Sequence, residues 1–361
     1  MMCRDEVNRM PMRQLIIVVA LLLATSWQGA NAAVELTDLY QHRVAVTSQA
    51  NAERDRALQE ALRATLLKLS GDTELLQQPA VSAALRDVRS YVVQYGYQQD
   101  DQLWLWAQFD QPRLDRLIQD AGSGIWSNLR PRMLVWFVAE DEQGKRELYP
   151  ADSEAIVVQQ LRNAAEQRGL PIQLPLMDLN DSMTVSVIDV WARFMDTLSF
   201  GAARYSSDGM VVARIYPNPN QDDLNASKWA GDWSLHVADL RWRGTVSGMD
   251  FDTLGAAIIE DVTAQLAARY RISSQSEQRM DWTVNIQNLR SVDDTIAAEQ
   301  FLAQLPSVSK VQLIGYGKGV GQFRMSLQTD PAQIRQAMML SKRMQALETD
   351  SQTDFRWIIN P

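Results

Sequence analysis

The sequence contains very little cysteine and histidine, with one Cys and two His among 361 residues. A lone cysteine, Cys3, cannot form a disulfide within the chain, and His42 and His236 alone cannot make a Cys/His zinc site. The same shortage leaves few routes to a catalytic triad, and the Gly-x-Ser-x-Gly elbow of serine hydrolases is absent. We therefore expect a protein that is not an enzyme, with no catalytic residue, no metal site and no cofactor.

Positive charge is also in short supply. Lys and Arg number 35 against 44 Asp and Glu, so the formal net charge is −9. Such a chain lacks the positive field that binding to phosphate backbones needs, which excludes nucleic acid as the expected partner.

Long hydrophobic runs are missing too. The apolar run Leu15–Ala24 is half of the ~20 residues of a membrane-spanning helix, so we expect no transmembrane anchor.

That apolar run belongs to a basic, then apolar, then small-residue pattern at the start of the chain. Three arginines precede it, and Ala30-Asn31-Ala32 follows it. This order is typical of a secretory signal peptide. We predict a signal peptide over residues 1–32, cleavage after Ala32, and a soluble protein in the periplasm. The start of translation stays open between Met1, Met10 and Met12.

The remaining composition is that of a globular protein, with 46% hydrophobic and 22% charged residues. The order of predicted elements indicates the α+β class, as several small two-layer α/β sandwich domains in series. We predict an N-terminal α+β domain over 33–121, a middle α/β domain over 130–272 and a C-terminal domain over 279–361. Ala121–Gly124 is the clearest linker.

The N-terminal domain is predicted to have the order β-α-α-β-β-α. Helical spacing of Leu and Ala indicates a helix from Asn51 that Gly71 ends. The other elements are predicted over Leu36–Thr47 (strand), Val81–Asp87 (helix), Ser90–Gln98 and Gln102–Phe109 (strands), and Gln111–Gln119 (helix).

The middle domain is predicted to begin with a βαβ crossover. Its first strand, Arg132–Ala139, is apolar enough to be buried on both faces, and a helix over Ser153–Arg168 leads to a strand over Pro171–Leu176. The later elements are predicted near Thr184–Ala192 (helix), over Gly209–Tyr216 and Ser234–Thr245 (strands), and over Asp252–Arg269 (helix). Pro217–Ala230 is predicted to be an exposed loop.

The C-terminal domain has the pattern βαββαβ, which is typical of a ferredoxin-like fold. Residues 291–294 form a capping box that starts a helix to Gln304, and Asp330-Pro331 starts a second helix to Met344. The strands are predicted over Trp282–Ile286, Ser309–Ile314, Phe323–Thr329 and Phe355–Ile359. The glycine-rich Gly315–Gly321 lies between two strands and lacks the Walker pattern, so it indicates a hairpin turn with Lys318 at its tip.

Two kinds of residue are candidates for a site. Asp178 and Asp181 are paired carboxylates, the groups that glycosidases use. Trp229, Trp233 and Trp242 cluster around the predicted loop, where exposed aromatic side chains favour contact with a protein, a lipid or a glycan. Lys318 is a further candidate for contact with an acidic partner.

Several strings in the chain resemble an uncharacterised exported family of Gram-negative bacteria, domain of unknown function 2066. The resemblance rests on the helix text 54–71, on the string from Gly169 through Pro171 and Pro175 to Asp178 and Asp181, and on the paired tryptophans Trp229 and Trp233. Arg204-Tyr205 followed by Asp208 also fits. The resemblance implies export and no assigned activity, so it carries over no catalytic residue.

These observations predict a non-catalytic interaction or accessory factor in cell-envelope assembly, whose partner is another periplasmic or envelope protein. One alternative is a periplasmic protein that binds a lipid or a glycan. The other is an envelope-glycan hydrolase that uses paired carboxylates such as Asp178 and Asp181.

Overall fold

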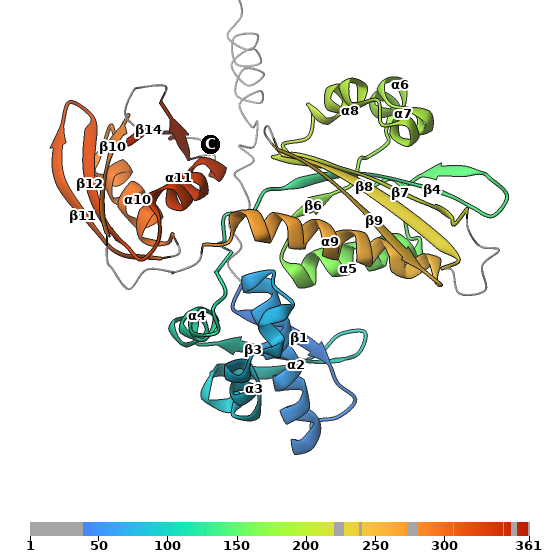
Figure 1. Cartoon of the computed structure of the whole chain (residues 1–361), viewed down its shortest axis with the longest axis horizontal. Helices are drawn as coiled ribbons and strands as arrows, with labels where there is room; N and C mark the ends of the chain where they lie inside the picture. Colours follow the sequence, from blue (N-terminus) through green and yellow to red (C-terminus); the bar gives the residue numbers. More distant parts are fainter. Residues whose placement is uncertain are drawn as a thin grey trace, which may run out of the picture.

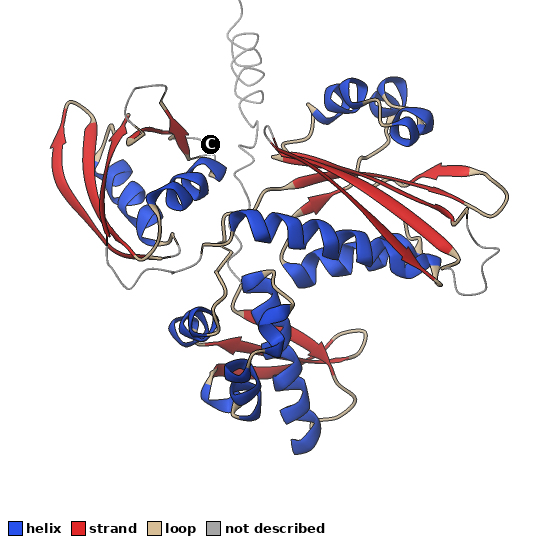
Figure 2. Ribbon diagram, in the orientation of Figure 1, coloured by secondary structure: helices blue, strands red, loops and turns tan. Residues whose placement is uncertain are grey.

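The fold was obtained as a computed structural model, which describes residues 39–126, 128–219, 227–237, 240–272, 280–305, 307–341, 343–347 and 352–359. The predicted signal peptide and Cys3 lie outside these ranges. Three β-sheets follow one another along the described chain, and each is packed against its own helices (Figures 1 and 2). This mixture of helices and largely antiparallel sheets belongs to the α+β class.

The N-terminal part has a three-stranded antiparallel sheet in the order β1-β3-β2. Its elements are β1 (Gln41–Ala45), α2 (Asn51–Ser70), α3 (Pro79–Arg86), β2 (Val92–Gln99), β3 (Leu103–Phe109) and α4 (Gln111–Asp120), with 3-10 turns at Glu74–Gln77 and Val88–Ser90. Leu58, Leu62 and Leu66 of α2 are buried against the sheet. Gly71 ends α2 in the left-handed conformation, with φ 64°, as the sequence predicted.

The central part has a six-stranded sheet in the order β5-β4-β7-β8-β9, with β6 also paired to β4. Its strands are β4 (Met133–Glu140), β5 (Arg146–Leu148), β6 (Ile172–Gln173), β7 (Gly209–Pro217), β8 (Trp229–Val237) and β9 (Leu240–Gly248). Its helices are α5 (Ile156–Arg168), α6 (Leu179–Thr184), α7 (Val187–Ala192), α8 (Met195–Ala202) and α9 (Phe251–Tyr270). The predicted βαβ crossover is present, because β4 and β6 are parallel and α5 lies between them in sequence.

The two faces of the central sheet are covered differently. Helices α5 and α9 pack side by side on one face and bury the largest core, while α6, α7 and α8 lie over the other (Figure 1). The small core beneath α6–α8 takes its sheet residues from β4, β5 and β7 and none from the described residues of β8 or β9. Among the described residues, the small core on the second face therefore extends over β4, β5 and β7.

The C-terminal part has a five-stranded sheet in the order β11-β12-β10-β14-β13. Its elements are β10 (Met280–Gln287), α10 (Val292–Ala303), β11 (Val308–Gly317), β12 (Val320–Leu327), α11 (Pro331–Leu340), β13 (Met344–Ala346) and β14 (Asp354–Trp357). The predicted capping box is present, because the Ser291 hydroxyl accepts from the Asp294 N–H and Asp294 accepts from the Ser291 N–H. Beyond the prediction, α11 ends at Leu340 and β13 follows it.

Several predictions for the central part were wrong. The strand predicted over Ser234–Thr245 is two antiparallel strands, β8 and β9, which pair over their whole lengths. Trp229 and Ala230 belong to β8, so the predicted loop is shorter; its residues 220–226 lie outside the described ranges. The strand predicted over Pro171–Leu176 has only two paired residues, and three short helices replace the single one near 184–192.

Candidate functional site

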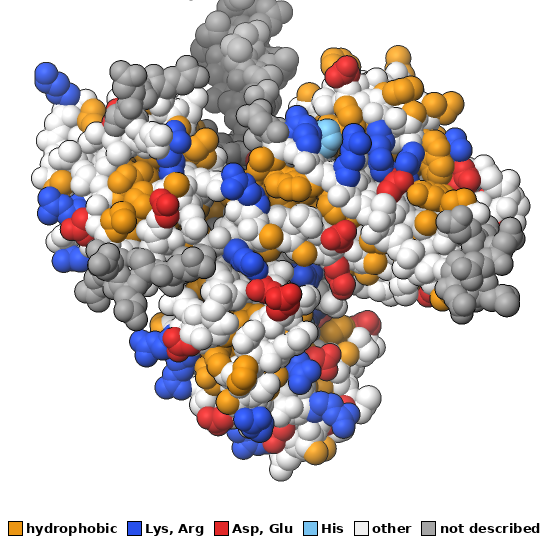
Figure 3. All heavy atoms as spheres, in the orientation of Figure 1, with side chains coloured by type: hydrophobic (Ala, Val, Ile, Leu, Met, Phe, Trp, Pro, Cys, Tyr) orange, Lys and Arg blue, Asp and Glu red, His pale blue; other side chains and the backbone are white. Residues whose placement is uncertain are grey.

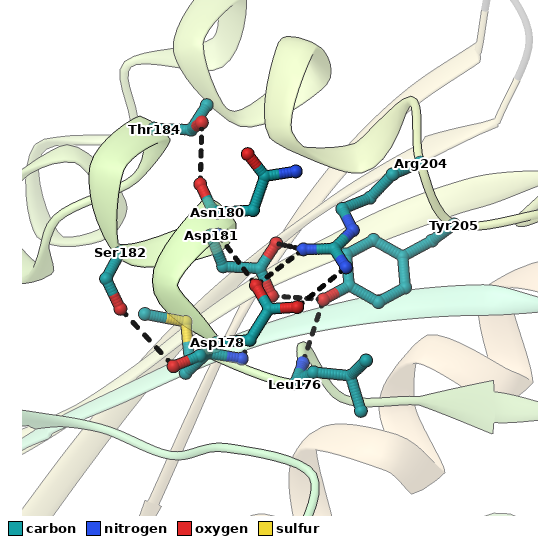
Figure 4. Close-up of polar contacts among 9 residues, drawn as sticks. Leu176, Asp178, Asn180, Asp181, Ser182, Thr184, Arg204 and Tyr205 are labelled. Carbon is teal, nitrogen blue, oxygen red and sulfur yellow. Dashed lines mark hydrogen bonds and ion pairs between the residues drawn. The ribbon is translucent and has the colours of Figure 1, made fainter.

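The paired carboxylates lie at the start of α6. Asp178 is the N-cap of this helix, where its side chain accepts from the backbone N–H of Asp181 at 3.0 Å. The guanidinium of Arg204, just after α8, donates to both carboxylates, at 2.7 and 2.8 Å to the two oxygens of Asp178 and at 2.9 Å to Asp181. The Tyr205 hydroxyl donates to Asp181 and accepts from the Leu176 N–H at 2.8 Å (Figure 4).

We call Asp178, Asp181, Arg204 and Tyr205 the carboxylate clasp. The hydrogen bonds from Arg204 lower the pKa of Asp178 well below its ordinary value. Burial and the hydrogen bond to Asp181 raise the pKa of Tyr205 to about 12. Asp181 is 1% exposed, and both of its oxygens accept hydrogen bonds, one of them also from the Met177 N–H at 2.9 Å.

This geometry does not suit glycoside hydrolysis. A general acid needs a carboxyl whose pKa is raised so that it holds a proton, and Asp178 is shifted in the opposite direction. The second carboxylate, Asp181, faces Arg204 and Tyr205 rather than open space (Figure 4). The clasp instead fastens the segment before α6 to the segment after α8.

The other residues of the predicted family string, Gly169, Pro171 and Pro175, have structural roles in the backbone: one ends a helix and two accept backbone hydrogen bonds. Gly169 ends α5 with φ 63°, and a Cβ there would lie 2.9 Å from an Arg130 nitrogen. The carbonyl oxygen of Pro171 accepts from Met133, and that of Pro175 accepts from Ala151. These positions join α5, β4 and the segment leading to α6, and the structure gives them no group aimed at a ligand.

The tryptophans predicted as a contact surface are largely buried, which corrects that prediction. Trp229 is 8% and Trp233 is 1% exposed, and both belong to the core beneath α9. Trp229 packs edge-to-face on Phe251, and the Trp233 indole donates to Asp261 at 2.9 Å. Trp242 is partly buried and packs against the same core. The small and polar residues between Trp229 and Trp233 indicated a loop, although they belong to β8, which is buried over most of its length.

Lys318 lies where the sequence placed it, exposed in the turn between β11 and β12. It has φ 54° and Gly319 has φ 76°, the two left-handed positions of a type I′ hairpin turn. The predicted hairpin is confirmed, but its turn consists of Lys318 and Gly319 alone, because Gly315–Gly317 belong to β11 and Val320 and Gly321 to β12. The contact of Lys318 with an acidic partner stays a prediction.

The structure reveals a surface that sequence reasoning missed. Large apolar side chains on and beside the three short helices α6, α7 and α8 point outward, away from the small core on the sheet side. We call this the α6–α8 surface; it consists of Leu176, Leu179, Met183, Ile188, Phe194 and Phe200. Leu179, Met183 and Phe200 are 78%, 79% and 75% exposed. The missed signal is a run of short helices, each with an apolar residue on the outer side.

The sequence also did not indicate a cluster of arginine side chains around Asp232. This cluster lies on the face of the central sheet that carries α6–α8, toward β8. Arg214 of β7 and Arg193, at the end of α7, both donate to Asp232 of β8. Two guanidinium groups lie within cation–π distance of the Trp191 indole, with Cζ of Arg146 at 3.9 Å and Cζ of Arg214 at 5.3 Å from the ring centroid. Arginine side chains thus gather where α7 meets β7 and β8.

The described part of the chain lacks two features that would bear on function. It has no group of three or more His, Cys, Asp or Glu side chains placed to hold a metal ion. None of its helices has the length and the apolar composition to cross a membrane.

Comparison with known proteins corrects the family resemblance. The family model that matches is described as "Domain of unknown function (DUF8605)" and covers residues 33–127. The resemblance to domain of unknown function 2066 was therefore wrong. The text 54–71 lies within the matched range, whereas the string 169–181 lies outside it. No curated protein matches the chain.

Among solved structures, two of S. aureus homoserine dehydrogenase match, determined at pH 7.0 and at pH 6.5. They are 9% and 8% identical, each match covers 29% of this chain, and both have a TM-score of 0.14. The matches span 27% and 28% of the dehydrogenase chains. A likeness this low carries no argument about fold or activity. What the comparisons establish is that residues 33–127 match a domain of unknown function.

Proposed function

We propose that this protein is an exported, non-catalytic interaction factor in cell-envelope assembly, and that it contacts a partner protein through the α6–α8 surface. The observation that carries this proposal is the exposure of Leu179, Met183 and Phe200, each at least 75% exposed. Single exposed apolar residues are ordinary on a protein surface, but large ones gathered on adjacent helices mark sites of contact.

The arrangement beneath this surface supports a binding role. Val185, Val190 and Leu198 of the same segment already pack on Trp136 and its neighbours in a small core. The outward side chains are therefore not needed to hold the helices on the sheet. The carboxylate clasp fixes both ends of the segment, so that the exposed side chains are presented on a rigid base, which lowers the entropy lost on binding.

The proposal includes a location and a domain organisation. The basic and apolar pattern of residues 1–32 supports export to the periplasm. Separate cores under the three sheets support small α/β domains in series, with boundaries near 33–121, 130–272 and 279–361. The central one departs from a two-layer α/β sandwich, because α6–α8 add a third layer on its second face. The strand order β11-β12-β10, in which β12 lies between β10 and β11 as in a split βαβ motif, supports a ferredoxin-like C-terminal domain. The parallel pairing of β10 with β14 and the additional strand β13 depart from the antiparallel sheet of that fold.

A site-specific crosslinking experiment tests the partner surface. A photoreactive amino acid is placed at Met183, and as a matched control at Met249, which is 71% exposed in the turn between β9 and α9. We expect illumination of living cells to give a discrete protein adduct from position 183 only. Phe200→Asn should abolish that adduct without changing the melting temperature, because its side chain is 75% exposed.

Two results contradict this reading. Equal adduct patterns from positions 183 and 249 would mean that the α6–α8 surface has no specific partner. Adducts at 183 that contain lipid or glycan rather than protein would establish the alternative of a lipid- or glycan-binding protein.

A further inference from the structure

On the half of the central sheet formed by β8 and β9, where the core beneath α6–α8 does not extend, polar and basic side chains form a row, in which Asp232 and Ser234 are buried by their neighbours. On this face β8 presents Asp232, Ser234 and His236, which pair in register with Thr245, Arg243 and Arg241 of β9. Figure 3 shows Lys and Arg side chains gathered in a row over these strands, beside the apolar side chains of the helices. This face is basic although the whole chain has a net charge of −9.

One carboxylate on this face is shared by two arginines. Asp232 accepts from Arg193, from the Nε of Arg214 at 2.9 Å, and from a terminal nitrogen of Arg214 at 2.7 Å. It also accepts from the Tyr216 hydroxyl at 3.2 Å. The remaining terminal nitrogen of Arg214 donates to the Trp191 carbonyl at 2.6 Å. Asp232 and Arg214 are thus fully engaged with each other and with their neighbours.

Arg193 and Ser234 keep unused hydrogen-bonding capacity. The Nε of Arg193 and the Oγ of Ser234 are buried and have no hydrogen-bond partner among the described residues. Ser234 is 1% exposed. A buried polar group without a partner is rare in folded proteins, because it loses its hydrogen bonds to water and gains none in return.

The backbone at Arg193 is also unusual. It takes φ 58°, the left-handed conformation that closes α7 and that Gly or Asn adopts more easily. The residue at this position is nevertheless an arginine, with a long and charged side chain. Here that side chain reaches from the end of α7 over β8, where it meets Asp232.

Arg243 completes a cluster of positive charge. It lies opposite Ser234 across the β8–β9 pair and is exposed. Burial lowers the pKa of Arg193, Asp232 opposes that change, and the charges of Arg214 and Arg243 lower it further. The three arginines and Asp232 sum to a charge of +2. Arg241 adds a further positive charge beside His236.

We propose that Arg193, Arg243 and Ser234 form a binding site for a phosphate monoester. Such a group carries about −1.5 to −2 charges at pH 7, which matches the unbalanced charge of the cluster. Guanidinium groups bind phosphate oxygens through paired N–H donors, and the Ser234 hydroxyl supplies one more donor. The site is separate from the α6–α8 surface and stands whether or not that surface binds a partner.

Calorimetric titration of the folded protein with inorganic phosphate and with glycerol 3-phosphate tests the site, at constant ionic strength set with chloride. Co-flotation with phosphatidylcholine vesicles, with and without phosphatidic acid, tests the same chemistry on a lipid headgroup. We expect one of two results: saturable binding to the dissolved phosphates, or binding to vesicles that requires phosphatidic acid. The first result assigns a soluble phosphate ester as the ligand, and the second assigns a phospholipid.

Variants separate a binding role from a structural one. Arg243→Gln should weaken binding at least tenfold, whereas Arg324→Gln, an exposed arginine on β12, should leave it unchanged. Ser234→Ala should weaken binding and raise the melting temperature of the unliganded protein, because it removes a buried hydroxyl that lacks a partner. Absence of saturable binding to all three probes, or binding by Arg243→Gln equal to that of the unchanged protein, would overturn the proposal.

Discussion

His42 is a titratable side chain whose environment predicts how stability depends on pH. It lies partly buried on β1, opposite Ala107. Burial, followed by the charges of Lys68 and Arg43, lowers its pKa from 6.5 to about 4. A histidine whose pKa is lowered in the folded state is neutral there and becomes protonated on unfolding. It therefore destabilises the fold progressively as the pH falls from 6.5 to about 4.

We predict that the unchanged protein loses about 2 kcal/mol more of its free energy of unfolding between pH 7 and pH 5 than His42→Gln does. The glutamine does not titrate, so it serves as the control for every other ionisable group. Denaturant titrations of both proteins at the two pH values give the comparison. Equal losses would show that His42 keeps an ordinary pKa in the folded protein.

Gly244 shows how one residue decides the packing of a buried tryptophan. It lies opposite Trp233 in the β8–β9 pair, and a Cβ at this position would lie 2.4 Å from the indole ring. Gly244→Ala should therefore destabilise the protein by about 1–3 kcal/mol, as overpacking of a core does. Gly317→Ala is the control, because a Cβ there meets nothing within 4 Å. Thermal unfolding of both variants measures the difference, and equal melting temperatures would contradict it.

The secondary elements divide into those that local sequence determines and those that it does not. Helix α2 and the capping box of α10 were predicted correctly, because caps and periodic leucines act within one or two turns. The β8–β9 hairpin was predicted as one strand, because its separation into two shows only in the pairing of β8 with β9, which the local sequence does not determine. Helix α8 was missed, and its position depends on packing over β4.

The candidate sites divide in the same way. Asp178 and Asp181 could be noticed because their spacing is short, but Arg204, which decides their chemistry, contacts them from 26 and 23 positions away. The cluster around Asp232 involves Arg214 and Arg193, 18 and 39 positions away. Charge composition alone predicted no basic surface, because an acidic chain can gather its arginines only through pairing of strands that the sequence does not show.

The attachment of α6–α8 to the sheet gives a prediction about this group of helices. Tyr205 links Asp181 to the Leu176 N–H, so Tyr205→Phe leaves a buried carboxylate oxygen and a backbone N–H with one partner fewer. The free energy of unfolding should fall by about 1–3 kcal/mol. Hydrogen exchange should rise in 176–205 more than in α5 or α9.

Tyr316→Phe, which removes a hydroxyl that donates to the Leu289 carbonyl in the C-terminal part, is the control. A uniform rise across the central part would contradict a local role for the clasp.

At the scale of the whole molecule, the N-terminal part is joined to the central part by contacts between distant segments. Arg130 is buried and donates to the carbonyls of Arg168 and Gly169 at 2.6 and 3.1 Å, and also to that of Lys68. Ile125 and Ile272 exchange backbone hydrogen bonds, and Arg271 pairs with Asp72 at 3.1 Å. The end of α2 therefore docks on α5 and α9 through backbone groups as well as side chains.

Gly71 lies at the centre of this contact and allows it to be tested. A Cβ at Gly71 would lie 2.0 Å from the Cβ of Ala267 on α9. Gly71→Ala must therefore push α2 and α9 apart, in addition to straining a backbone with φ 64°. Gly122 has φ 79° but meets nothing within 4 Å, so Gly122→Ala measures the backbone strain alone, about 1–2 kcal/mol.

We expect Gly71→Ala to lose clearly more stability than Gly122→Ala. We also expect its calorimetric transition to divide, with the N-terminal part unfolding at a lower temperature than the rest. The reason is that contacts between α2 and α9 make the two parts unfold together. The added methyl group of Gly71→Ala would overlap the Cβ of Ala267, so these contacts would be lost. Equal losses in the two variants, with a single transition in each, would mean that α2 does not rest on α9 in solution.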